Sequence, residues 1–256
     1  MTILCYHSVT PGWTSPLAVA PEHFAEHCAW LARRRTVVPL DRAVASLDAS
    51  GRLPHGVAAL TFDDGFRDFH TYAFPVLARY GLPATVFLVA QTLTEHGQRV
   101  DWVDTPPAEE LQTLDLEQVR EMQSAGVGFA SHSWSHADLT TLGFDACVRD
   151  LRDSRELLES LLGHRVRFLA YPRGRHDATV RAAAERAGYT HAFTLPESRE
   201  SSGPYAIPRV GLYHGNGVGA LRVKAARPYL RVRTGPAYEL ARRVRRRTEV
   251  AVPWRA

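Results

Sequence analysis

The segment AALTFDDG, residues 58–65, decides the fold, because it has the pattern of an apolar strand that ends in two carboxylates. Neighbouring side chains of a strand point to opposite faces, so Asp63 and Asp64 serve one site only if the backbone turns there. Gly65 permits such a turn, since glycine adopts conformations that strain other residues. The segment therefore predicts an active site at the end of a buried strand, with different roles for the two carboxylates.

A second segment supplies two imidazoles. The apolar residues 127–130 precede His132 and His136, which are four residues apart. Carboxylate and neutral imidazole together suit zinc and its borderline neighbours, and three protein ligands leave positions open for water and substrate. Considered alone, the two carboxylates are equally consistent with an ordinary turn. The two histidines alone are equally consistent with the solvated face of a helix. Together they favour a catalytic site for a divalent ion.

These residues resemble the first two motifs of a known enzyme family. TFDDG at residues 61–65 and HSWSH at residues 132–136 are similar to motifs of the polysaccharide deacetylases, carbohydrate esterase family 4, which have a NodB-type homology domain. The resemblance implies that Asp63 is the general base. It implies a divalent metal, zinc before cobalt, nickel or manganese. The implied metal ligands are Asp64, His132 and His136.

The third motif of that family is matched only in part. AYPRG, residues 170–174, resembles the family form Arg-Pro-Pro-Tyr-Gly but has Ala170 in place of the arginine that orients the base in the family. The fourth motif is not recognisable in residues 188–194. An ordinary turn is the alternative for residues 170–174, since proline and glycine both favour turns. The expected replacements for the arginine are Arg173, Arg175 and Arg167, and the expected substrate contacts are Tyr171, Arg173 and Gly174.

Two histidines are candidates for the general acid. His7 follows the apolar residues 3–6, and His214 follows Leu212-Tyr213 late in the chain among several glycines. The opening of the chain resembles the subgroup of exopolysaccharide deacetylases, such as those acting on poly-N-acetylglucosamine, in which the motif order is circularly permuted and the acid comes first. We therefore predict His7 as the acid, with His214 as the alternative in a mobile loop.

Strand and helix patterns alternate along the chain, which is typical of parallel βα units. About seven such units would form a distorted parallel (β/α)7-type barrel, and the resemblance implies the same single-domain fold. In such barrels the reacting groups lie at the C-terminal ends of the strands, where His7, Asp63, His132 and Tyr171 are predicted. Strands are expected near 2–6, 36–38, 57–62, 84–89, 127–131, 166–170, 190–194 and 206–210, and helices near 21–35, 40–48, 68–80, 115–124, 144–162 and 177–187.

Residues 91–113 interrupt this alternation without a clear period, which predicts a substrate-facing loop. Trp102 in this segment and Trp134 in the second motif are candidates for stacking on sugar rings. Packing of either ring against the barrel is the alternative.

Composition fits one domain. The 256 residues are 45% hydrophobic, enough for one core, and we divide them into a barrel, residues 1–219, and a basic helical tail, residues 220–256. No stretch approaches the roughly 20 apolar residues of a membrane span, and no signal peptide is recognisable, so a cytoplasmic protein is expected. The three cysteines, Cys5, Cys28 and Cys147, are expected to be buried thiols in a reducing compartment.

The net charge of +4 is concentrated after residue 220, and no nucleic-acid recognition module is visible, so no nucleic-acid partner is expected. Tyr238, Leu240 and Val244 lie near one side of a possible helix whose other side carries arginines. This pattern predicts weak contact with a membrane surface through the tail, a solvated or disordered end being the alternative.

The predicted function is metal-dependent removal of N-acetyl groups from an amino sugar in a polysaccharide, oligosaccharide or glycan precursor. No Gly-x-Ser-x-Gly segment is present, and the chain has a single lysine, Lys224, which leaves few nucleophilic mechanisms. In the remaining mechanism, Asp63 takes the proton of a water and His7 protonates the departing amine. One alternative is a deacylase of a non-polysaccharide amide or ester, such as a lipid-linked sugar or a small natural product. The other is a non-catalytic sugar-binding relative.

Overall fold

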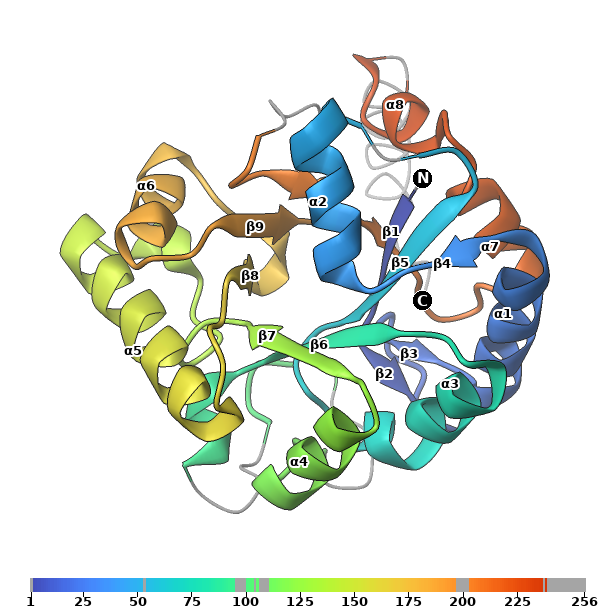
Figure 1. Cartoon of the computed structure of the whole chain (residues 1–256), viewed down its shortest axis with the longest axis horizontal. Helices are drawn as coiled ribbons and strands as arrows, with labels where there is room; N and C mark the ends of the chain where they lie inside the picture. The colour runs from blue at the N-terminus through green and yellow to red at the C-terminus, as the bar shows by residue number, and fades with distance from the viewer. Residues whose placement is uncertain are drawn as a thin grey trace, which may run out of the picture.

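The computed structural model describes residues 2–52, 54–94, 100–103, 105, 111–196, 203–236 and 238. Its main element is a parallel sheet with the strand order β10-β9-β8-β7-β6-β5-β1-β11, and β4 pairs with the start of β5. The sheet curves into a nearly closed barrel with helices around it (Figure 1). The strands are β1 (Thr2–Tyr6), β4 (Thr36–Val37), β5 (Val57–Phe62), β6 (Ala84–Leu88), β7 (Gly128–Ser131), β8 (Phe168–Ala170), β9 (His191–Thr194), β10 (Ile207–Pro208) and β11 (Val210–Gly211).

The strands are apolar on both faces because both faces are covered, as in other parallel sheets. In β1, Ile3 belongs to the core inside the barrel and Leu4 to the core beneath the helices. Ala59 and Leu60 of β5 alternate in the same way. The predicted parallel β/α barrel is therefore confirmed.

The helices include α1 (Pro21–Arg34), α2 (Leu40–Ser50), α3 (Phe74–Tyr80), α4 (Leu116–Ser124), α5 (Phe144–Leu162), α6 (Ala178–Arg186), α7 (Val218–Lys224) and α8 (Tyr229–Arg233). Sequence signals explain several of their ends. Asp115 forms a capping box with Gln118 at the start of α4, and Gly163 ends α5 in the left-handed conformation. The predicted helix over 68–80 is interrupted, because Phe69–Ala73 forms a π-helical turn before α3.

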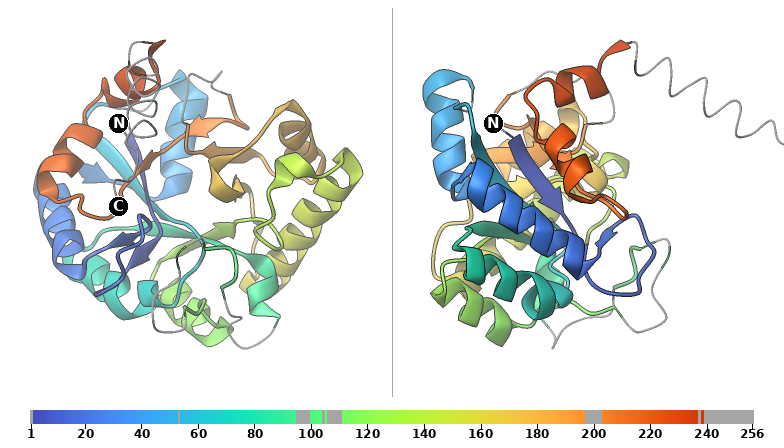
Figure 2. Two further views of the ribbon diagram at one scale, coloured as in Figure 1. Left: turned by 180° about the vertical axis from the view of Figure 1, so that it is seen from behind. Right: turned by 90° about the vertical axis from the view of Figure 1, so that its right-hand side faces the viewer.

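Helix α2 covers one end of the barrel (Figure 1). Its residues Leu40, Ala43 and Val44 pack against inward-facing strand residues such as Ile3 and Phe87. Figure 2 shows α2 and the α7–α8 segment at opposite ends of the barrel in its right-hand view. With one end closed by α2, the polar strand ends are left at the other.

The two edges of the sheet approach each other in the region that was predicted to form one strand, residues 206–210. The expected strand over 206–210 is divided, since β10 pairs with β9 and β11 pairs with β1 at the other edge of the sheet. Arg209 lies between the two short strands, and its backbone N–H donates to Thr194 O at 3.0 Å. A short parallel pair, β2 (Ser8–Val9) and β3 (Ala18–Val19), was not predicted.

The predicted division into domains stays a prediction. Helix α7 crosses its boundary between residues 219 and 220, and Leu221 and Ala225 belong to the main core. Most of the predicted amphipathic tail, residues 239–256, lies outside the described residues, so membrane contact also stays a prediction. Across the described ranges, none of the helices has both the length and the apolarity needed to span a membrane. Cys5, Cys28 and Cys147 are buried and unpaired, as predicted.

Candidate active site

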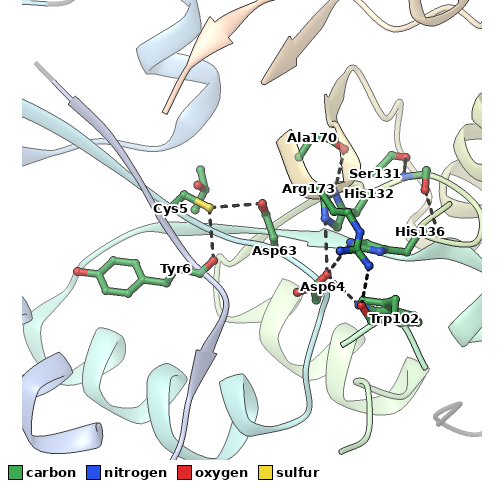
Figure 3. A network of polar contacts seen from close by, with 12 residues as sticks. Cys5, Tyr6, Asp63, Asp64, Trp102, Ser131, His132, His136, Ala170 and Arg173 are labelled. Carbon is green, nitrogen blue, oxygen red and sulfur yellow. Dashed lines mark hydrogen bonds and ion pairs between the residues drawn. The ribbon is translucent and has the colours of Figure 1, made fainter. Parts of the chain in front are cut away.

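The polar residues predicted to form one site do meet at one end of the barrel. Asp63 and Asp64 directly follow β5, and His132 directly follows β7. Figure 3 shows Asp64 facing both His132 and His136, with Asp63 on the side toward Cys5. All four residues are buried. The most exposed of them, His136, has 8% of its surface accessible to solvent.

The backbone turns sharply at this site. Within the described part of the chain, the non-glycine residues with positive φ are Asp64, Ser133, His136 and Arg173, and all four belong to the segments around it. Such conformations cost about 1–3 kcal/mol each and persist where the surrounding structure enforces them. Asp64 itself, with φ of 69°, makes the turn that lets both carboxylates serve one site. Gly65 was expected to allow this turn, and it too has a positive φ.

Gly65 is required for a further reason. A Cβ atom at this position would lie 2.8 Å from Leu88 Cδ2 of β6, closer than real Cβ contacts. The glycine thus lets the loop after β5 lie against the neighbouring strand. Any other residue here would be strained by the positive φ and would require the Leu88 side chain to move.

Asp64, His132 and His136 form a donor set that fits a divalent ion. Their ligand atoms all lie within 4.8 Å of one another. The Nε2 atoms of His132 and His136 are 3.6 Å and 3.2 Å from Asp64 Oδ1. One carboxylate and two imidazoles with an open side match the donor chemistry of a catalytic zinc-type site. Cys5, His7 and Asp63 form a second such group, but Arg209 already occupies the Asp63 carboxylate.

Surrounding contacts orient these ligands. Nδ1 of His132 donates to the carbonyl oxygen of Ala170 at 2.8 Å, which directs Nε2 toward Asp64. Trp102 Nε1 donates to Asp64 Oδ1 at 3.1 Å, and the Trp102 ring stacks on His136 with a centroid distance of 5.1 Å. Together these contacts fix the ring planes and one oxygen of the donor set.

The protonation states also suit a metal. Burial lowers the pKa of His132 to about 4, so its imidazole is neutral at physiological pH. Burial alone would raise the pKa of Asp64, but contact with His136 holds it below the ordinary value. Neutral imidazoles and an ionised carboxylate are the forms that bind metal ions.

Asp63 is held by an arginine that the sequence reasoning missed. Arg209 Nη1 and Nη2 donate to the two oxygens of Asp63 at 2.6 Å and 2.7 Å, a bidentate pair in the barrel interior. Arg209 Nη1 is also 3.2 Å from Thr61 Oγ1. Burial by itself would raise the pKa of Asp63, but the Arg209 guanidinium outweighs this and holds the pKa well below its usual range. Asp63 is therefore ionised.

The prediction that Arg173, Arg175 or Arg167 replaces the missing arginine of the third motif is wrong. Arg173 Nη2 donates to Trp102 O, Arg175 pairs with Asp138, and Arg167 lies over the Phe168 ring. Arg209 lies between β10 and β11, where the two edges of the curved sheet approach each other, and from there its side chain reaches Asp63. A signal was present in the sequence, since an arginine within an apolar strand needs a buried anionic partner.

The two candidate acids occupy different environments. His7 is 9% exposed, lies on the cleft with Asp63, and has a donor atom within 4.8 Å of Asp63 and Cys5. Its ring stacks on Tyr213 with a centroid distance of 6.3 Å, and Nδ1 has no hydrogen-bond partner. His214 is exposed and does not line the cleft. This arrangement favours His7.

The centre opens into a cleft of about 390 Å³. Two of the predicted substrate contacts, Trp102 and Arg173, line it, and their contact with substrate stays a prediction. The described part of the 91–113 segment that reaches the cleft comprises Trp102, Val103 and Thr105. The predicted substrate-facing position of this segment is thus supported.

Three other predicted substrate contacts do not line the cleft. Tyr171 is fully buried in the main core, where its hydroxyl donates to Tyr205 O at 3.1 Å. Trp134 packs against the same core, so its predicted stacking on a sugar is not supported. Gly174 is buried, and a Cβ there would lie 2.7 Å from Leu195 N. Its role is to allow the tight turn that presents Arg173.

Comparison with known proteins gives a consistent result. The family model described as Polysaccharide deacetylase matches residues 50–192. YxkH of Bacillus subtilis (strain 168), which carries the name of a polysaccharide deacetylase, is 28% identical over 214 residues, 82% of this chain and 70% of that protein. The poly-beta-1,6-N-acetyl-D-glucosamine N-deacetylase of Staphylococcus epidermidis is 26% identical over 204 residues, 75% of this chain and 67% of that protein.

Solved structures share the fold. The Streptococcus pyogenes deacetylase PplD in complex with acetate has a TM-score of 0.73 at 24% identity, covering 88% of this chain and 98% of that one. IcaB from Ammonifex degensii has a TM-score of 0.70 at 24% identity, covering 88% and 95%. The family match extends over more than half of the residues, and its TFDDG and HSWSH segments carry the clustered donors. This chain therefore belongs to the polysaccharide deacetylase family.

Proposed function

We propose that the protein is a metal-dependent hydrolase that removes N-acetyl groups from an amino sugar in a polysaccharide, oligosaccharide or glycan precursor. One observation carries the proposal. An ionised buried carboxylate, Asp63, lies beside a three-residue donor set for a divalent ion at the base of an open cleft. A base next to a metal site is the arrangement required for attack of water on an amide.

The proposed roles of the residues follow from their surroundings. Asp63 accepts a proton from the attacking water, and Arg209 keeps its carboxylate ionised and fixed in orientation. His7, across the same pocket, donates a proton to the nitrogen as the C–N bond breaks. Attack of water and loss of the amine give acetate and a free amino sugar.

Asp64, His132 and His136 would hold the metal. The family is metal-dependent, and the donor set here fits zinc, with cobalt, nickel or manganese as alternatives. A bound divalent ion would supply Lewis-acid polarisation of the acetamide carbonyl and would make water more acidic. The neighbouring Trp102 and Ala170 contacts serve to keep the ligands in place.

The relatives support an N-acetylated glycan as the substrate. The Staphylococcus epidermidis relative is a poly-beta-1,6-N-acetyl-D-glucosamine N-deacetylase. The first histidine of this chain and the late arginine, His7 and Arg209, lie outside the residues matched by the family model. Their position next to Asp63 supports catalysis rather than simple sugar binding, because a binding protein needs neither a base nor its arginine partner.

The test measures acetate release. Metal-replete protein is incubated with N-acetylated glucosamine oligosaccharides of β-1,6 and β-1,4 linkage, and acetate is compared with that released by Asp63→Asn. The variant should lose about 10²–10⁴-fold in rate, as expected for loss of a general base. Its metal content should not change. Equal acetate release by the two proteins, or none from any N-acetylated sugar, would overturn the proposal.

A further inference from the structure

Helix α8 forms part of the wall of the active-site cleft. Tyr229, Leu230 and Arg233 of this helix line the same cleft as Asp63 and His132. The sequence reasoning assigned this region to a tail separate from the barrel. Its position at the end of the barrel opposite α2 is visible in Figure 2. The C-terminal region therefore contributes to the surface on which substrate lies.

The cleft lining carries more arginines than carboxylates among the described residues. Among the described lining residues, the carboxylates are Asp63 and Asp64 and the guanidinium groups are Arg173, Arg209 and Arg233. Arg209 neutralises Asp63, and Asp64 belongs to the proposed metal ligands. Arg233 adds a positive charge on α8, and the described lining contains no carboxylate besides these two.

Arg233 is a half-buried residue of the cleft wall with an unsatisfied hydrogen-bond donor. Its Nη1 atom is buried and has no hydrogen-bond partner. Its guanidinium lies over the Tyr238 ring at 4.6 Å, and its side chain also interacts with Tyr229. Aromatic packing holds the guanidinium plane in place, so less conformational freedom is lost on binding. An unpartnered buried donor costs stability, which a carboxylate or phosphate oxygen would restore through a charged hydrogen bond.

We propose that the substrate carries an anionic group, a carboxylate or a phosphate, which binds Arg233 while the acetamido group lies at Asp63. The inference rests on the proposed function and specifies its substrate class as an acidic N-acetylated glycan. Arginine recognises both anions because its paired N–H groups match two of their oxygens. A neutral N-acetylglucosamine polymer offers only uncharged oxygens, whose hydrogen bonds to a guanidinium are weaker than those of an anion.

Three test compounds distinguish a carboxylate from a phosphate as the anion that Arg233 binds. The neutral arm is an N-acetylglucosamine tetrasaccharide. The carboxylate arm is a hyaluronan tetrasaccharide, in which glucuronate alternates with N-acetylglucosamine, and the phosphate arm is N-acetylglucosamine 1-phosphate. For metal-loaded full-length protein, kcat/KM should be at least about tenfold higher for one anionic arm than for the neutral arm.

Variants of α8 provide the matched comparison. Arg233→Gln should lower kcat/KM for the preferred anionic arm by about 10- to 100-fold and leave the neutral arm unchanged, as expected for loss of a hydrogen bond between charged groups. Arg231→Gln removes the same charge from an exposed position of the same helix that does not line the cleft, and should change neither arm. Arg233→Lys should retain part of the preference.

Binding is measured independently of turnover. Calorimetric titration of Asp63→Asn with the two anionic compounds should give a Kd that rises about 10- to 100-fold when Arg233→Gln is added. Equal binding with and without Arg233, or equal use of neutral and anionic arms, would overturn the inference. Acetate release from the neutral arm alone would leave the proposed function intact and refute this substrate class. No acetate from any arm, with Arg233-dependent binding, would refute the catalytic proposal and support the anion site.

Discussion

The cleft has two parts that differ in how their charges are held. The catalytic centre, Asp63, Asp64, His132, His136 and Arg209, is almost fully buried, and each of its charged groups has a partner. The rim, Trp102, Arg173, Tyr213, Tyr229 and Arg233, is partly exposed. Strand ends supply most of the centre, whereas loops and α8 supply the rim.

This difference shows where chemistry and substrate choice are separated. A buried charge must be paired, so a change in the centre disrupts both the reaction and the fold. A partly exposed residue of the rim is screened by solvent, and its replacement affects chiefly what binds. We therefore expect centre variants to lose activity on every substrate and rim variants to alter preference.

The largest effect is expected from loss of a proposed metal ligand. His132→Ala should lose stoichiometric divalent metal and reduce kcat/KM by roughly 10³-fold or more, since metal catalysis supplies several kcal/mol and each 1.36 kcal/mol is tenfold. Metal analysis of the purified protein and acetate release measure the two effects. His55→Ala, which removes an exposed histidine, is the control and should change neither. One equivalent of metal retained in the His132→Ala/His136→Ala double variant would refute this assignment.

Arg209 should matter most for stability. Arg209→Gln leaves Asp63 ionised and unpaired in the interior, which should lower the free energy of unfolding by about 3–5 kcal/mol. Urea denaturation measures this loss. Arg173→Gln removes an arginine of the rim and should change the free energy by only about 0.5 kcal/mol.

The double variant Asp63→Asn/Arg209→Gln sharpens this comparison. It removes both charges, so it should be more stable than Arg209→Gln alone. If Arg173→Gln destabilised the protein as much as Arg209→Gln, the contrast between centre and rim would not hold.

Variants of the two candidate acids test whether His7 belongs to the catalytic centre. His7→Ala should lower kcat by about 10²-fold or more with metal still bound, because a general acid acts in the transition state. His214→Ala should have little effect, since His214 is exposed and lies off the cleft. Steady-state kinetics with metal analysis distinguish them. The reverse result would assign the acid to the glycine-rich loop.

The smallest effect is expected for replacement of Trp102, a residue of the rim that contacts the proposed metal ligands. Trp102→Phe keeps an aromatic ring beside His136 but removes the hydrogen bond to Asp64, and should weaken metal affinity by about 10- to 100-fold. Competition with a metal chelator measures this change. Trp134→Phe is the matched control, because Trp134 packs against the core away from the cleft. Equal effects of the two substitutions would mean that the hydrogen bond to Asp64 has no specific role.

The predictable parts of the site are those that depend on short segments of the sequence. Residues 58–65 predict β5 and the carboxylates after it, and the spacing of His132 and His136 indicates a shared site. Strand periodicity predicts that both segments end at the same edge of a parallel sheet. Tyr171 was misassigned because it is adjacent to a strand end yet its side chain turns into the core.

Local sequence therefore determined the alternating strands and helices, the two carboxylates and the paired histidines, because each depends on strand pattern and short spacing. Only the tertiary structure placed Arg209 on Asp63, 146 residues away in sequence, and brought α8 to the cleft. Both depend on how the sheet closes, with β10 and β11 pairing to opposite edges. Closure is a property of all the strands together, and no single segment of the sequence encodes it.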